Sequence, residues 1–210
     1  MKQGILALLA LVLGLTLAAC ETMSAEECAT ADWRGLGFND AASNGADRYG
    51  DRAESCAEKG YAADSEAYAI GFSAGIVQFC QPPNGFQFAL RGSTFNGSCP
   101  PELQSDFYAA YNDGRRIHDA RSELSTAESE LSQLERRYNN FEEDIRNSEA
   151  ALRDATTDEE RARLRAEIDS YYRERRDMRD DLEEADRRVR YARRTIDDLR
   201  YEIGYRWSTW

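Results

Sequence analysis

Five cysteines carry the most distinctive chemistry in this 210-residue sequence, because a thiol can form a disulfide, bind a metal or take a covalent modification. A metal site is disfavoured: the sequence has no Cys-x-x-Cys motif, and its only histidine, His118, lies far from the cysteines. We therefore expect no metal and no other cofactor. The five are Cys20, Cys28, Cys56, Cys80 and Cys99.

Cys20 ends a typical export leader. Lys2 supplies a positive start, and the apolar run over residues 5–17 has the length of a signal-peptide core but is short for a bilayer span. The following Leu-Ala-Ala-Cys, residues 17–20, resembles the lipobox of bacterial lipoproteins. The resemblance implies a signal peptide over residues 1–19, cleavage before Cys20, and a diacylglyceryl group on its thiol. An ordinary secretory signal with a free cysteine is the alternative.

The same resemblance predicts a location. Two or three fatty chains would make the anchor permanent, whereas one binds only marginally. In enteric lipoprotein sorting, Asp after the lipidated Cys favours inner-membrane retention, so Glu21 favours the outer membrane, facing the periplasm. The inner membrane is the alternative. The stretch before Cys28 would then be a tether of at most about 25 Å.

The charge of the chain excludes some partners. Its net charge is -12, and no basic face of the kind that binds nucleic acid is apparent. Nor does it have a polybasic segment for anionic lipid headgroups. Membrane association would therefore depend on the lipid at Cys20.

The four remaining cysteines predict a disulfide framework, because an exported protein meets an oxidising compartment. Four cysteines allow three connectivities. We favour the sequential pairing, Cys28–Cys56 and Cys80–Cys99. Each bridge closes a loop of roughly 20 to 30 residues and would stabilise the fold by about 3 kcal/mol in the chain-entropy model.

The composition of the chain changes near residue 103. Residues 20–102 hold all four prolines, the four pairing cysteines and most of the glycine, whereas residues 103–210 contain no Cys or Pro and are rich in Arg, Glu and Asp. This change predicts a Cys/Gly-rich globular module over 20–102, packing with the helix start to about residue 116. A long helical region over 103–210 follows it.

A short pattern recurs at residues 37–41, 71–75 and 110–114: small, aromatic, polar, variable, small. Small residues four apart lie on one helical face and allow another backbone to approach closely. The favoured interpretation is three helices that pack through these faces. A tetratricopeptide-like array is disfavoured, because the copies are short and unevenly spaced.

The stretch between Cys80 and Cys99 contains a Pro-Pro-Asn-Gly turn signal at residues 82–85, followed by alternating apolar residues. We expect a short hairpin or irregular loop closed by the disulfide. The favoured interpretation is that its aromatic side chains cover a small core. The alternative is a partner surface made of Phe86, Arg91, Phe95 and Asn96.

Several short motifs in this module occur in a recognisable arrangement. They are Cys28-x-x-x-Asp32-Trp33, Gly37-Phe38-x-Asp40, Cys80 before a turn, and Asn96-Gly97-x-Cys99-Pro100 before a helix. Over roughly residues 20–120 the chain resembles an uncharacterised proteobacterial lipoprotein family with a domain of unknown function. It departs from that family at Ala41, where Gly is expected. The resemblance implies a location and a module shape, but no activity.

The C-terminal region has a clear heptad pattern. Apolar residues recur every seven positions from Ile117 to Leu152, with a second series offset by three, and steps of four and three continue over residues 164–203. Thr157 and the acids after it predict a helix start, so the turn lies near residues 154–160. The pattern predicts two long helices with a left-handed coiled-coil seam.

Folding the chain at this turn gives an antiparallel hairpin in which every seam alanine faces a larger residue, such as Ala127 opposite Val189. A parallel homodimer would place alanine on alanine and leave gaps. We therefore predict an intramolecular antiparallel coiled-coil hairpin and a monomer. In the one misfit layer, Arg175 would stack on Phe141 or extend outwards. The fold class is mainly α, a disulfide-stapled helical and loop module followed by this hairpin.

Aromatic residues cluster at the C-terminus. The hairpin would return them to the first module, where we expect them to dock beside residues 107–111. The alternative is an exposed aromatic tail that a partner contacts, with Trp207 and Trp210 as candidates.

No residue cluster in the sequence indicates catalysis. His118 faces away from the seam and is expected on the surface, and the carboxylates lie on helix surfaces without a predicted pocket. The one enzymatic arrangement to test is a cell-wall hydrolase pair, Asp40 with Asp113. We expect no enzyme, but an envelope structural or adaptor lipoprotein whose coiled coil binds another envelope protein or peptidoglycan. The alternative is a module that binds a small ligand or cell-wall fragment with its Cys80–Cys99 loop.

Overall fold

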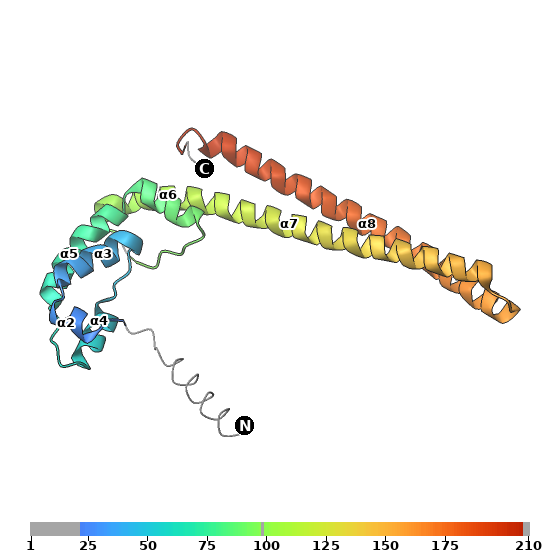
Figure 1. Ribbon diagram of the computed structural model, residues 1–210. Coiled ribbons are helices and arrows are strands. Elements are labelled where there is room, and N and C mark those ends of the chain that lie inside the picture. Colours follow the sequence, from blue (N-terminus) through green and yellow to red (C-terminus); the bar gives the residue numbers. More distant parts are fainter. Residues whose placement is uncertain (1–21, 98, 208–210) are drawn as a thin grey trace, which may run out of the picture. The chain divides into compact units, whose positions relative to one another are not determined.

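The computed structural model describes residues 22–97 and 99–207, so Cys20 and Trp210 lie outside the described residues. Every regular element in the described part is a helix, which confirms the mainly α prediction (Figure 1). The chain divides into two compact units. In the described part, the N-terminal unit comprises residues 22–89 and 93–112, and the hairpin unit comprises residues 90–92 and 113–207.

Short helices build the N-terminal unit, and polar side chains cap several of them. The Ser24 hydroxyl accepts from the Glu27 N–H, and the Glu27 carboxylate accepts from the Ser24 N–H, which is a capping box. Asp32 and Asp64 each cap a longer helix by accepting from the backbone N–H three residues further on. The helices are α2 (Ala25–Ala29), α3 (Trp33–Asn44), α4 (Tyr49–Ala57), α5 (Ser65–Phe79), α6 (Pro82–Leu90) and the start of α7 (Pro101–Asp154).

Helices α3 and α5 pack backbone to backbone through glycine. A Cβ atom on Gly71 would lie 1.9 Å from the Arg34 carbonyl oxygen, and one on Gly75 would lie 2.3 Å from the Phe38 carbonyl oxygen. Residue numbers rise together along the two helices at these contacts, so the helices run in the same direction. The first two copies of the recurring pattern therefore pack through their small faces, as predicted.

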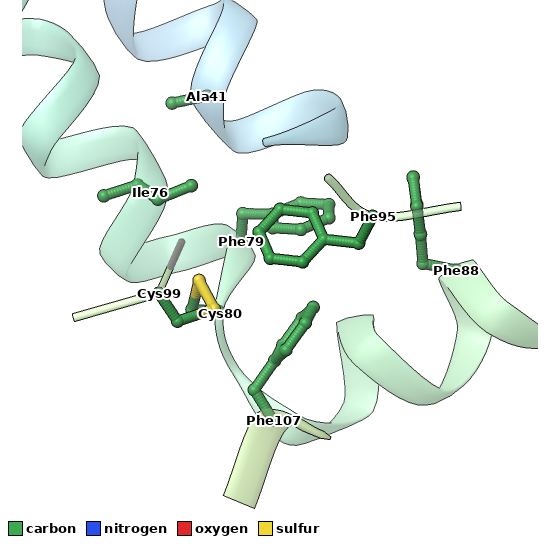
Figure 2. Packing of buried hydrophobic residues seen from close by; sticks show 8 residues of the cluster. All are labelled: Ala41, Ile76, Phe79, Cys80, Phe88, Phe95, Cys99 and Phe107. Carbon is green, nitrogen blue, oxygen red and sulfur yellow. A yellow bond between two sulfur atoms is a disulfide. The ribbon is translucent and has the colours of Figure 1, made fainter. Parts of the chain in front are cut away.

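An aromatic core fills the space among α3, α5, α6 and α7 (Figure 2). Phe95, from the loop before α7, lies at the centre, with ring centroids 5.3 Å from Phe79 and 5.0 Å from Phe107. Figure 2 shows the phenyl rings of Phe79, Phe88, Phe95 and Phe107 converging beside the Cys80–Cys99 disulfide. This disulfide holds the loop so that Phe95 reaches the core.

The other disulfide belongs to a second small core. Cys28 and Cys56 join α2 to α4, with a Cα–Cα distance of 5.4 Å. Met23 packs on this bridge, with its sulfur 3.8 Å from the Cys56 sulfur, and Trp33 and Tyr68 complete the cluster. Both disulfides therefore join the pairs of the sequential connectivity.

The stretch predicted as a hairpin or irregular loop is in fact helix α6 over its first nine residues. Pro82 and Pro83 occupy the first turn of that helix, where no N–H donor is needed and a fixed φ favours the helix. Gly85 packs against the backbone of Phe107, with a hypothetical Cβ 2.8 Å from its carbonyl oxygen. The turn signal was misleading because the same residues also begin helices.

The main elements of the hairpin unit are the rest of α7 and α8 (Asp158–Ile203), which residues 155–157 join. Thr157 caps α8 by accepting from the Glu160 N–H. Four arginine–glutamate pairs join the two helices, and the residue numbers in α8 fall as those in α7 rise. The helices are therefore antiparallel and lie side by side (Figure 1), as predicted. These pairs are Arg116–Glu202, Glu128–Arg193, Glu130–Arg188 and Glu142–Arg175.

The seam of the hairpin is buried at both ends and half-exposed in the middle. Ile117, Ile145, Leu164 and Ile203 are buried. The middle positions are half-buried because large side chains meet there and two helices cannot enclose them: Leu131, Leu134, Tyr138, Phe141, Tyr171, Arg175, Met178 and Leu182.

In the predicted misfit layer Arg175 extends outwards, which is one of the two expected arrangements. Arg175 lies over the Tyr172 ring, 4.8 Å from its centroid, and its guanidinium is 3.5 Å from the Glu142 carboxylate. Phe141 instead packs edge-on against Tyr171, with centroids 5.3 Å apart. The cation therefore leaves the seam for a neighbouring carboxylate, and aromatic contact fills the layer.

Candidate functional site

A buried polar network joins three helices of the N-terminal unit. Arg52 of α4 donates from Nε and Nη2 to the two carboxylate oxygens of Asp40 on α3, at 2.8 and 2.7 Å. The Tyr68 hydroxyl of α5 donates to Asp40 Oδ2 at 2.9 Å and accepts from the Arg48 N–H. The paired charges and satisfied hydrogen bonds make this network a fixed point of the fold.

The environment of the network shifts two pKa values. The hydrogen bond to Asp40 raises the pKa of Arg52. Burial, reinforced by the negative charge of Asp40, raises the pKa of the Tyr68 phenol well above its usual range. Both groups therefore keep their protons, and their hydrogen bonds to Asp40 hold three helices together.

A surface pocket of about 320 Å³ lies beside this network. Arg52 lines this pocket together with Asn39 of α3 and Asp32, the residue before α3. Thr22 and Met23, at the start of the described chain, line it as well. Two of the five N–H donors of Arg52 already bind Asp40, so its charge is paired within the network. The pocket offers mixed polarity without a concentrated charge.

The structure divides the predicted loop surface into buried and exposed residues. Phe86 is 1% exposed and Phe95 is 9% exposed, so neither can present its ring to a partner. The prediction that they form a partner surface is therefore wrong, and the interpretation that they cover the core is right. Arg91 and Asn96 are exposed. The Phe95 ring is buried because the disulfide ties its segment onto the aromatic core.

A depression of about 500 Å³ lies next to Phe95 and Asn96. The turn after α3, residues 44–47, forms one wall, and Thr94 and Gly97 form the other. Its walls offer amide, hydroxyl and backbone groups and the Asp47 carboxylate. This chemistry suits a small polar ligand.

At the end of the chain, Trp207 and Asp113 interact within the hairpin unit. The indole N–H of Trp207 donates to Asp113 Oδ2 at 3.1 Å, and Arg206 pairs with the same carboxylate at 2.8 Å. Trp207 is half-buried, while Tyr201 and Tyr205 are 92% and 78% exposed. The exposed aromatic surface at this end therefore comes from tyrosines rather than from Trp207.

The predicted hydrolase carboxylates are each engaged locally. Asp40 is bound by Arg52 and Tyr68, and Asp113 by Arg206 and Trp207. The histidine prediction is corrected: His118 is half-buried, and its ring lies against Gly92, where a Cβ would be 2.4 Å from Cε1. Gly92 has a positive φ of 81°, which suits glycine at this contact.

The described residues contain no cluster of metal ligands and no membrane-spanning helix. In residues 22–97 and 99–207, no three or more His, Cys, Asp or Glu side chains gather closely enough to hold a metal ion. Within the same residues, no helix has the length and hydrophobicity needed to cross a membrane.

Sequence reasoning missed the arginine of the network. Asp40 was noticed as part of a motif, but Arg52 lies on a short, polar helix that looks solvent-exposed in the sequence. An acid on the small-residue face of α3 was the available signal, because a charge at a packing face requires a partner.

A family model matches part of the chain. The model of a family described as a protein of unknown function (DUF2799) matches residues 32–116. The matched stretch contains α3 to α6 and the start of α7, including both partners of the Asp40–Arg52 pair. The chain is therefore similar to a domain of unknown function over residues 32–116, within the region whose motifs predicted a family resemblance. No curated protein and no solved structure matches the chain.

Proposed function

We propose that this protein is a lipid-anchored lipoprotein of the outer membrane, facing the periplasm, in which the N-terminal unit lies close to the anchor and the hairpin binds a partner. The partner would be another envelope protein or peptidoglycan, and the role structural rather than enzymatic. The observation that carries the proposal is the lipobox-like sequence at residues 17–20 followed at once by a folded segment.

The length of the tether supports a position near the membrane. Met23 is buried, its backbone N–H donates to the Ser55 hydroxyl, and its side chain packs on the Cys28–Cys56 bridge. Two residues lie between Cys20 and this fixed point, so the three Cα–Cα steps reach about 10 Å when extended. The tether is thus much shorter than the distance to Cys28 suggested.

The two disulfides support an exported protein. They pair all four cysteines of the described residues, Cys28 with Cys56 and Cys80 with Cys99. Such bridges persist in oxidising compartments and are rare in the reducing cytosol. A chain that passes through the envelope would form them.

The experiment that tests the anchor is the Cys20→Ser substitution. We expect the precursor to accumulate uncleaved or the mature chain to appear in the soluble periplasmic fraction, because no thiol remains to take the lipid. Processing and membrane fractionation measure this, with the Glu21→Gln variant as the control for a neighbouring change. Normal cleavage and membrane retention of Cys20→Ser would contradict the proposal.

The adaptor role requires a crosslinking test suited to this chain. The hairpin unit contains arginine but no lysine, so amine-reactive reagents cannot reach it. A photo-activated amino acid at exposed hairpin positions such as Arg146 and Arg173 should capture one defined protein or glycan in cells. Loss of the hairpin with no change in crosslinks or in envelope integrity would contradict this role.

A second candidate function is favoured by the depression beside Asn96. Its amide and hydroxyl groups suit a small ligand or cell-wall fragment, and Phe95 lies beneath it. Titration with soluble cell-wall fragments, followed by NMR, should shift signals of residues 44–47 and 94–97. An Asn96→Trp variant should block binding, whereas Gln81→Trp on an exposed site elsewhere should not. Unshifted signals at saturating fragment concentrations would eliminate this candidate.

A further inference from the structure

A groove lies along the half-exposed middle of the hairpin. Its volume is about 450 Å³, and both helices line it. Phe141 of α7 and Met178 of α8 are its apolar lining residues, and both are half-buried. The groove therefore exposes the part of the seam that two helices alone leave uncovered.

The charged residues along this groove are mainly acidic. Asp144 on α7 and Glu174, Asp177 and Asp181 on α8 are carboxylates, whereas Arg137 is the lining base. In the described part of the chain, none of these four carboxylates forms an ion pair or a side-chain hydrogen bond. Elsewhere along the hairpin, cross-helix pairs such as Glu128–Arg193 and Glu130–Arg188 neutralise acids beside the seam. The middle of the hairpin thus combines an apolar surface with uncompensated negative charge.

We propose that this groove binds an amphipathic helix of a partner protein that carries lysine or arginine on both sides of an apolar stripe. An apolar side chain of that helix inserts between Phe141 and Met178. Its basic residues meet Asp144 on one wall and Asp177 and Asp181 on the other. The inference rests on the proposed function, since it names the partner-binding site of the hairpin and the chemistry of the partner.

The shape of the groove favours a helix over an extended peptide. Two antiparallel helices form a long channel, and a third helix packs into such a channel through residues at i, i+3, i+4 and i+7. The added helix would cover the half-buried seam residues and convert the two-stranded coil locally into three strands. An extended peptide finds no exposed strand edge there to pair with.

Charge selects among the possible occupants. An anionic lipid surface would be repelled by the four carboxylates. A two-fold pairing of two copies of this chain through the same groove would place the same acids against each other. A basic helix gains both charge complementarity and apolar burial, and its association would be fastest at low salt.

The test uses the full chain in nanodiscs of zwitterionic phosphatidylcholine, with empty nanodiscs as the blank. The probes are two labelled synthetic helices of about 18 residues with the same leucine stripe, one with lysine beside it and one with glutamate. Fluorescence anisotropy measures binding. We expect the lysine helix to bind and to lose affinity as salt rises, and the glutamate helix not to bind.

The decisive variant is Asp144→Asn with Asp177→Asn and Asp181→Asn. It should weaken binding of the lysine helix by about tenfold or more, because the walls lose most of their charge. The matched control, Glu135→Gln with Glu143→Gln and Asp180→Asn, removes the same charge from exposed positions outside the groove and should change affinity less than about twofold. Unchanged far-ultraviolet circular dichroism establishes that both variants are folded.

A Met178→Ala variant separates the contribution of apolar insertion from that of charge attraction. It should weaken binding of the lysine helix at high salt as well as at low salt. Equal losses in the groove and control variants would overturn the proposal, as would equal binding of the two probes. Sedimentation that shows dimers broken by the groove variant would assign the site to a second copy instead and also overturn it. The assay is independent of location, so its failure leaves the anchor experiment to decide the proposed function separately.

Discussion

The two units of this protein are stabilised by opposite means. In the N-terminal unit, α3 and α5 meet backbone to backbone at Gly37, Gly71 and Gly75, and two disulfides and one buried ion pair hold the remaining helices. In the hairpin unit, one repeating seam runs the whole length, without cysteine or proline. Stability is therefore concentrated at a few positions in the first unit and distributed over many in the second.

The largest expected effect is in the N-terminal unit, where stability depends on a few positions. In Gly71→Ala the new methyl group would lie 1.9 Å from the Arg34 carbonyl oxygen, so α3 and α5 must separate. We expect the N-terminal unit to lose about 3 kcal/mol or more, because the obstacle is backbone and cannot rotate away. Limited proteolysis should then cut this unit while the hairpin resists.

The control for that variant is Gly50→Ala. Gly50 lies in α4 with nothing within 4 Å of its hypothetical Cβ, so alanine should be neutral or stabilising by up to about 1 kcal/mol. Equal resistance of Gly71→Ala and the unsubstituted chain would show that the helix contact is not what holds the unit together.

The next effect concerns the buried ion pair. Asp40→Asn leaves the largely buried Arg52 guanidinium without its counter-charge and should destabilise the N-terminal unit by about 3 kcal/mol. Adding Arg52→Met should restore part of the loss, because it removes the uncompensated charge. Urea unfolding of both single variants and the double variant measures the coupling. Strictly additive losses would mean that the pair is not energetically linked.

A seam substitution should reduce the free energy of unfolding by less, because stability is distributed along the hairpin. Leu134→Ala removes a half-buried side chain from the middle layers, and we expect a loss of about 1–2 kcal/mol, below the range for fully buried leucines. Thermal unfolding at 222 nm checks it, with Ile117→Ala at the buried end as the larger reference. A collapse of helicity in Leu134→Ala would show that the hairpin, too, depends on single positions.

The smallest effect comes from the surface. Arg116 binds Glu202 through two hydrogen bonds and lowers the pKa of that carboxyl below its ordinary value of 4.5. Because the folded value is the lower one, the stabilisation is present above pH 4.5 and is lost as the pH falls through the folded value. Glu202→Gln should therefore lower the melting temperature only slightly at pH 7, and this difference should vanish in acid and in high salt. A difference that persists in acid would point to packing instead.

Periodicity made the hairpin predictable. Its two helices, turn, direction and seam residues follow from steps of three and four along the chain and from the match of small with large residues across it. The contacts of Arg175 were not predictable from that pattern, because its partners, Glu142 and Tyr172, lie outside the seam.

The N-terminal unit was predictable in part, for a physical reason. Small residues four apart indicated the close helix contact, and the count of cysteines indicated the bridges. Helix α6 was missed because prolines and glycine mark both turns and helix starts. The Asp40–Arg52–Tyr68 network was missed because residues from three helices meet there, and no local spacing relates them.

The short connection between α7 and α8 limits how this protein can change in length during evolution. Residues 155–157 are held in place, since Arg161 donates to the Ala155 carbonyl oxygen and Thr157 caps α8. An insertion in one arm would shift every seam residue beyond it against the other arm. We expect related chains to lengthen or shorten only by whole heptads, and by the same number in both arms, at positions facing each other across the seam.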